Sequence, residues 1–167
     1  KSEAFDFYDE SLMAVIASHL ASLVDYSRLR EEAEGRARNL GLIHEVVQQV
    51  IGLTDVHQVA EISAELLARY FAYELAAVFI ADAQGVLTIG GFGGTSQNVV
   101  RRAMKSFEYP ISGGITGHVF ETGESLVVND VSQDSRYRSL HGWQAGSEMC
   151  VAIRDGAKVL GIIDVES

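Results

Sequence analysis

The chain has 167 residues, of which 47% are hydrophobic and 22% charged, a composition typical of one folded domain with some length to spare. Its 13 Lys and Arg against 23 Asp and Glu give a net charge of −10. This balance excludes nucleic acid and anionic membrane surfaces as main partners, and no apolar run reaches the ~18 residues of a membrane span. The single cysteine, Cys150, excludes an internal disulfide and a Cys-rich metal cage, so we expect a cytoplasmic protein.

Residues 9–51 are predicted to form one long helix that pairs with a second helix. Positions four and three residues apart alternate along it, which is the seven-residue repeat of a coiled coil. The repeat runs through Leu12, Ile16, His19, Leu23, Tyr26, Arg30, Ala33, Ala37, Leu40, His44, Val47 and Ile51. One small domain cannot bury a rod of roughly 65 Å. We therefore predict a homodimer through residues 12–51.

The remaining residues predict a mixed sheet-and-helix domain. In chain order we expect a helix over 54–71, strands over 74–82 and 86–94, a helix over 96–106, a short strand over 109–112, a helix over 115–123 and a strand over 125–131. A polar loop over 132–146 precedes two strands, 148–154 and 158–166, joined by the turn Asp155-Gly156, a strong hairpin signal. This order predicts an α+β fold with an antiparallel sheet.

Several residues of the second part carry a resemblance to a known family. The runs GGITGHVFETGESLVVNDVSQDSRY and SEMCVAIRDGAKVLGIIDVES place glycines, an Asp and an Arg-Tyr pair at the spacing of a GAF domain. The matching positions are Gly114, Gly117, Gly123, Asp130, Arg136, Tyr137, Ser147, Gly156 and Gly161. The resemblance implies a six-stranded antiparallel sheet with helices on both faces. It divides the chain into an N-terminal connector helix, 1–37, and a GAF domain, 38–167.

The resemblance also implies a function. GAF domains are sensory modules of bacterial signalling proteins, which bind a small molecule and pass the signal to an output domain. We expect the same here, with the ligand and any cofactor unknown and no catalytic or metal-ligating residue. Carried over by position, the residues lining the ligand pocket are Phe79, Phe92, Ile115, Thr116, His118, Asp130, Tyr137, Trp143 and Cys150.

Other functions known in the same family require specific residues, which can be looked for in the sequence. A free-methionine sulfoxide reductase needs a second, resolving cysteine, which the chain lacks. A covalently held tetrapyrrole needs a Cys, often one beside a His, but Leu140 precedes His141. Haem ligation by one of the five His residues stays open, and so does a cyclic nucleotide, although its Asn-Lys signature is missing because Asp130 follows Asn129. A dimerisation module without ligand is the remaining alternative.

The N-terminal helix resembles the final helix of a preceding GAF domain. Residues 9–27 carry the stripe Leu12, Ile16, Leu20 and Leu23 that such a helix packs against a sheet. The missing initiator Met and the abrupt end at VES indicate a fragment of a longer protein. If the helix is straight, we expect residues 9–27 to cover the sheet of a partner subunit. A break near Gly35 or Gly41 would instead let it fold back.

Overall fold

The computed structural model describes residues 5–96, 98, 101, 113–139 and 143–167. The chain divides into two compact units, residues 1–41 and 42–167. Helix α1 (Phe7–Val50) makes up most of the first unit and continues into the second.

Helix α1 confirms the long N-terminal helix predicted from the repeat. It runs for 44 residues without a break at Gly35 or Gly41, so the condition for folding back is not met. Its charged middle is held by ion pairs one helical turn apart, such as Arg30 with Glu34 at 2.7 Å. Within the described residues, no helix has the length and apolar character needed to cross a bilayer.

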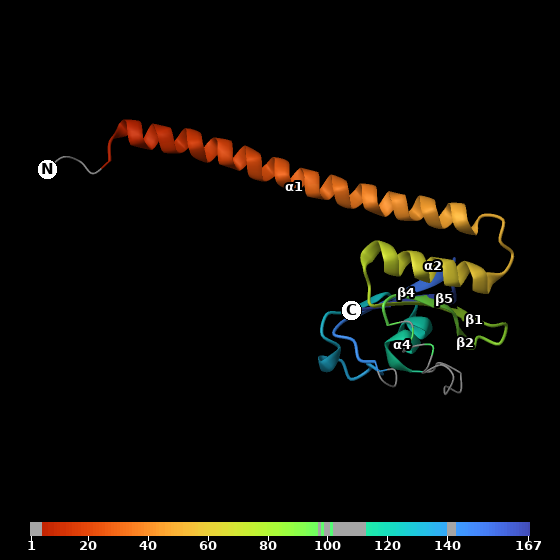
Figure 1. Ribbon diagram of the computed structural model, residues 1–167. Coiled ribbons are helices and arrows are strands. Elements are labelled where there is room, and N and C mark those ends of the chain that lie inside the picture. The colour runs from red at the N-terminus through yellow and green to blue at the C-terminus, as the bar shows by residue number, and fades with distance from the viewer. Residues whose placement is uncertain (1–4, 97, 99–100, 102–112, 140–142) are drawn as a thin grey trace. The chain divides into compact units, whose positions relative to one another are not determined.

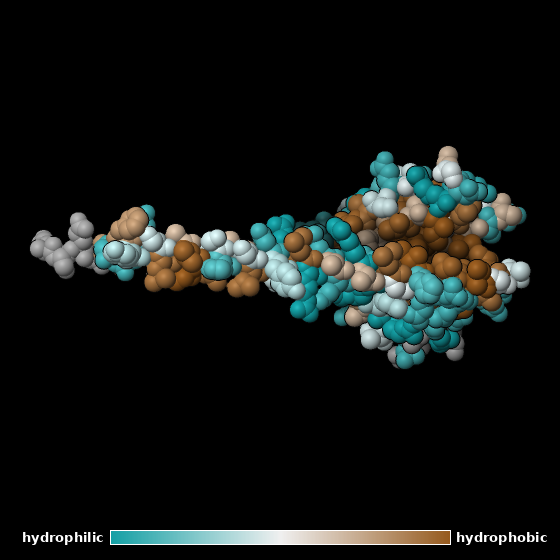
Figure 2. All heavy atoms as spheres, turned by 90° about the horizontal axis from the view of Figure 1, so that it is seen from above, coloured by the Kyte–Doolittle hydropathy of each residue, from teal (hydrophilic) through white to brown (hydrophobic). Residues whose placement is uncertain are grey.

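The repeat positions of α1 are largely exposed within the single chain. Leu12, Leu23 and Leu40 expose 58%, 63% and 66% of their surface. Figure 2 shows the hydrophobic residues of the N-terminal half of α1 followed by a hydrophilic stretch at its middle. Isolated apolar residues on a surface are ordinary, whereas large exposed apolar patches are typical of interaction surfaces.

The second unit contains an antiparallel sheet. Its strands are β1 (Leu75–Ala81), β2 (Leu87–Gly93), β3 (Leu126–Val128), β4 (Glu148–Asp155) and β5 (Lys158–Glu166), in the order β2-β1-β5-β4-β3. The described residues thus contribute five strands, one fewer than expected. The sixth, over 109–112, lies outside the described residues, as does most of the helix expected over 96–106.

Helices cover both faces of this sheet, as expected for the α+β fold (Figure 1). Helix α2 (Val56–Phe71) begins at Asp55, whose side chain accepts a 2.8 Å hydrogen bond from the His57 amide. It packs on β1 and β2 through small residues, including Ala60 and Ala64. Helix α4 (Gly114–Thr122) lies on the opposite face over β4 and β5.

Two glycines of β2 bring α2 unusually close to the sheet. A Cβ atom at Gly93 would lie 2.7 Å from the Glu65 Cα, and one at Gly91 would overlap backbone atoms of Ala60 and Glu61. Real Cβ atoms do not approach backbone that closely. The glycines therefore let the backbone of α2 rest directly on β2.

We expect Gly91→Ala to destabilise the second unit by about 2 kcal/mol or more, because the added methyl group must push α2 off the sheet. Gly35→Ala is the matched control, since nothing lies within 4 Å of its Cβ position. In a helix interior this control is expected to be stabilising by about 0.5–1 kcal/mol. Urea unfolding of both variants measures the difference. Equal stability of Gly91→Ala and the parent protein would contradict the close packing.

Candidate functional site

The face of the sheet opposite α2 carries a row of acidic residues. Side chains alternate between faces along a strand, so Glu148 and Cys150 of β4 point to the same side. In the pairing with β5, Cys150 lies opposite Asp164, and Glu148 lies opposite Glu166. Directly opposed residues of antiparallel strands share a face. The hairpin therefore gathers three carboxyl groups and one thiol, which we call the acidic cluster.

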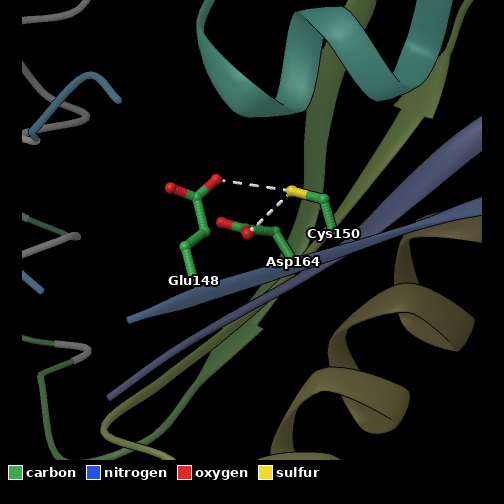
Figure 3. Close-up of side chains that lie close together, drawn as sticks. All are labelled: Glu148, Cys150 and Asp164. Carbon is green, nitrogen blue, oxygen red and sulfur yellow. Dashed lines mark hydrogen bonds between the residues drawn. The ribbon is translucent and has the colours of Figure 1, made fainter. Parts of the chain in front are cut away.

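Hydrogen bonds connect the members of the acidic cluster. The Cys150 thiol lies 3.0 Å from Asp164 Oδ1 and 3.4 Å from Glu148 Oε1, in position to donate to either (Figure 3). The Trp143 indole N–H donates to Glu166. Glu148, Asp164 and Glu166 expose only 6%, 4% and 6% of their surface. None of the three carboxyl groups forms an ion pair with a described residue.

Burial without a positive partner changes the protonation of these groups. Desolvation raises the pKa of Asp164 well above its usual value, and the neighbouring carboxylates of Glu148 and Glu166 raise it further. Desolvation also raises the pKa of Glu166 to about 7. The pKa of Glu148 is raised for the same reason. The acidic cluster therefore retains protons near neutral pH.

The Cys150 thiol is not a nucleophile in this setting. Its side chain is fully buried, and desolvation raises the pKa of the thiol, with further increases from Asp164 and Glu148. Reactive cysteines have the opposite environment, in which positive charge lowers the pKa and exposes a thiolate. Cys150 acts here as a hydrogen-bond donor to carboxylates.

Apolar side chains surround the acidic cluster. Ile115 and Val119 of α4 pack with Phe79, Ile162 and Cys150 in one buried group. Partly buried residues, among them Phe92 and Tyr137, pack against this group. The Tyr137 hydroxyl accepts a 2.9 Å hydrogen bond from the Ala145 amide, which ties the loop after β3 to the site.

The structure brings together part of the set of pocket residues predicted from the sequence. Phe79, Phe92, Ile115, Tyr137 and Cys150 belong to the same packed group, and Trp143 joins the acidic cluster through Glu166. Thr116 and His118 lie half-buried on α4. Asp130 is exposed and uses its carboxylate locally, where it accepts hydrogen bonds from the Ser132 amide and hydroxyl.

His118 lies close to an ion pair on the same side of the sheet. Asp134 accepts two hydrogen bonds from the Arg136 guanidinium, at 2.9 and 2.6 Å. These bonds, together with the Arg136 amide, lower the pKa of Asp134 to about 2, and the nearby His118 contributes a smaller lowering. This pair keeps its charge across the physiological range, unlike the acidic cluster.

The sequence did not predict the three carboxyl groups as part of the site. The two-residue alternation of the strands could have indicated that they share a face with apolar residues. On β4 this face carries Glu148, Cys150 and Ala152, and on β5 it carries Ile162, Asp164 and Glu166. Charged residues inside strands are usually read as exposed, because acidic side chains are rarely buried unpaired. Here the face they share is the covered one.

The donor set of the acidic cluster suits a cation. One ligand atom each from Glu148, Cys150 and Asp164 lies within 4.8 Å of the others, close enough to coordinate a metal ion. The same oxygens can accept hydrogen bonds from an ammonium group. Either cation would replace the protons that burial otherwise holds on the carboxyl groups.

Sequence comparison assigns the fold to a family. The sequence model of the GAF domain matches residues 55–167, which is most of the chain. The chain belongs to the GAF domain family. This confirms the resemblance seen in the sequence motifs, and it confirms the fold. No curated protein matches the sequence.

Solved structures with the same fold include both GAF domains of larger proteins and free methionine-R-sulfoxide reductases. The GAF domain of A. aeolicus nlh2 in an inactive state is 20% identical, with a TM-score of 0.64, and the match covers 79% of this chain and 80% of that one. The GAF domain of a phosphoenolpyruvate-protein phosphotransferase from Coxiella burnetii is 16% identical, with a TM-score of 0.62 and coverages of 77% and 76%. The free methionine-R-sulfoxide reductase of Neisseria meningitidis in complex with its substrate is 18% identical, with a TM-score of 0.60 and coverages of 75% and 71%. At these identities the likeness is one of fold.

The acidic cluster predicts an inverse dependence of stability on pH. The pKa of Glu166 is about 7 in the folded protein against an ordinary value of 4.5. The folded state therefore binds more protons than the unfolded state between these values, and its stability falls as the pH rises from about 4.5 through 7. Such a pKa difference corresponds to about 3 kcal/mol.

We expect Glu166→Gln to flatten this dependence, because an amide keeps the size of the protonated acid and does not ionise. Urea unfolding at several pH values from 5 to 8 measures it, and the exposed Glu124→Gln is the matched control. If the free energy of unfolding of the parent protein rises with pH over this range, burial does not raise the pKa of these carboxyl groups and the prediction is wrong.

Proposed function

We propose that this GAF domain is a non-catalytic sensor in a signalling protein of the cytoplasm. In this proposal a small molecule binds over the acidic cluster, α1 pairs with a second copy, and the paired helices pass the signal to an output domain of a longer chain. The observation that carries the proposal is the acidic cluster itself, because a group of buried carboxyl groups without a basic partner is costly to keep for structure alone.

The chemistry of the acidic cluster favours a ligand with a protonated amine. An ammonium group supplies the positive charge that Glu148, Asp164 and Glu166 lack, and its N–H groups donate to their oxygens. The apolar side chains of Phe79 and Ile115 would contact the rest of the molecule. Free methionine sulfoxide, on which the structurally similar reductases act, is an amino acid and carries such an amine.

Catalysis by the reductase route is disfavoured for this chain. Thiol reduction of a sulfoxide needs an attacking thiolate and a second thiol to resolve the intermediate. Cys150 is the single cysteine of the sequence, and burial raises the pKa of its thiol. We propose binding without turnover. A dimerisation module without a ligand is the alternative, in which the carboxyl groups serve only in the hydrogen bonds with Cys150 and Trp143.

We expect a compound with a primary amine to raise the thermal unfolding temperature, with free L-amino acids, methionine among them, as the first probes. Saturation at about 100 times the Kd corresponds to roughly 2.7 kcal/mol. Asp164→Asn should abolish the shift, because it removes the most buried carboxylate, whereas the exposed Glu124→Gln should retain it. Binding should strengthen from pH 6 to 8 as the carboxyl groups lose their protons.

Two outcomes would contradict this ligand class. One is a shift produced by divalent metal ions and by no amine, which would make the acidic cluster a metal site. The other is reduction of methionine sulfoxide by the protein with a thiol reductant, which would make Cys150 catalytic.

We expect the protein to be a dimer that Leu40→Lys and Val47→Lys together convert to a monomer, since both changes put charge into the apolar repeat. Light scattering at tens of micromolar measures the mass. Ser18→Lys with Asn39→Lys is the matched control, because both positions are exposed on the other side of α1. A monomeric parent protein would refute the pairing.

A further inference from the structure

In the part of α1 that belongs to the second unit, the repeat faces away from helix α2. In the last turns of α1, Leu42 is buried, and Glu45 accepts a 2.6 Å hydrogen bond from Tyr70 and pairs with Arg69, both on α2. Leu40 and Val47 lie on the opposite side of α1 and expose 66% and 46% of their surface. The large apolar residues of the repeat are all exposed within the single chain.

Side-chain size along the repeat is uneven, and this decides the direction of pairing. The large residues Tyr26 and Arg30 come before the midpoint, and Ala33 and Ala37 come after it. In a parallel, in-register pair each residue meets its own copy. Arg30 would then face the partner's Arg30, which places like charges together. The two alanine layers would leave gaps, which well-packed interfaces avoid.

We infer that two copies of α1 pair antiparallel, about a two-fold axis that crosses the helix between residues 31 and 32. This inference rests on the proposed dimer. The axis brings Tyr26 against the partner's Ala37, and Arg30 against the partner's Ala33. Each long side chain then meets a small one, and the two arginines no longer face each other.

The same axis aligns the apolar ends of the repeat. Leu12 meets the partner's Ile51, Ile16 meets the partner's Val47, and Leu23 meets the partner's Leu40. His19 faces the partner's His44, so the two polar layers also coincide. All twelve positions of the repeat are paired, and none is left over at either end.

The contact is large enough for a stable dimer. Burial of one Leu, Ile or Val side chain removes about 60–120 Å² from water. The large apolar residues of the repeat in two copies together bury on the order of 1,000 Å², which reaches the size of specific protein interfaces. The interface is isologous, so it closes with two copies and does not propagate.

Antiparallel pairing gives the N-terminal half of α1 a regulatory partner. Residues 12–23 of one copy lie beside residues 40–51 of the other, where the partner's second unit begins. Ligand binding in one GAF domain would therefore act on the N-terminal half of the other copy's helix. This arrangement differs from the expectation that residues 9–27 cover the sheet of a partner subunit, because their apolar stripe here packs on the partner's helix α1.

Cysteine cross-linking tests the direction. Leu23→Cys and Leu40→Cys chains, refolded together and oxidised, should give a disulfide dimer, whereas either variant alone should give none. In the antiparallel pair the two copies of position 23 lie about 25 Å apart along the axis. Leu12→Cys with Leu40→Cys is the matched control and should not cross-link. Cys150 stays in place, because it is buried with a raised thiol pKa.

Each outcome decides between the proposals. A disulfide dimer of Leu23→Cys alone means parallel pairing and overturns the direction while the dimer stands. A monomer by light scattering removes the dimer and the direction together. Spin labels at the exposed Ser18→Cys provide a measurement that leaves the repeat intact. The expected separation is roughly 40 Å along the axis, whereas adjacent labels would overturn the inference.

Discussion

The second unit depends on how it accommodates three carboxyl groups that its sheet removes from water. Charged carboxylates are costly in such a place unless a cation accompanies them, and the described residues supply none. Burial raises the pKa of Glu166 to about 7, and the protein meets the constraint by keeping carboxyl groups protonated. A bound cation would meet it more fully. If the proposed ligand binds there, the same three carboxyl groups determine both folding stability and ligand affinity: their protonated form stabilises the folded protein, and their ionised form binds the cation.

The two faces of the sheet differ in their capacity to change. On one face, Gly91 and Gly93 allow backbone-to-backbone contact with α2, which leaves no room for adjustment. On the other, the acidic cluster holds exchangeable protons beneath α4 and the loop that carries Trp143. Through Glu45 with Arg69 and Tyr70, the end of α1 is fixed to α2, the rigid layer.

The sequence predicted the features that local patterns determine. The seven-residue repeat predicted helix α1, and the Asp155-Gly156 turn predicted the β4–β5 hairpin. The glycine and Arg-Tyr motifs predicted the family. The sequence did not predict the acidic cluster, because the burial of these residues depends on which face of the sheet α4 covers. The bond between Trp143 and Glu166 joins residues 23 positions apart in the chain, and no local pattern encodes it. For Asp130, the resemblance to the family predicted a contact with the ligand. In the structure its carboxylate accepts a hydrogen bond from the Ser132 amide and so caps the short helical turn that follows.

In the proposed dimer, the charged middle of α1 contributes more to the alignment of the two helices than to their affinity. Exposed ion pairs such as Arg30 with Glu34 are worth only about 0.3–0.5 kcal/mol each, enough to keep the helix continuous where the apolar stripe is weak. In the proposed antiparallel pair, a shift of one heptad either way would bring Arg30 against the partner's Tyr26 or the partner's Leu40. Either shift also leaves two terminal repeat positions without a partner. A single alignment sets both long side chains against alanine and uses every apolar layer, so the least apolar part of the helix selects the register that the apolar ends then stabilise.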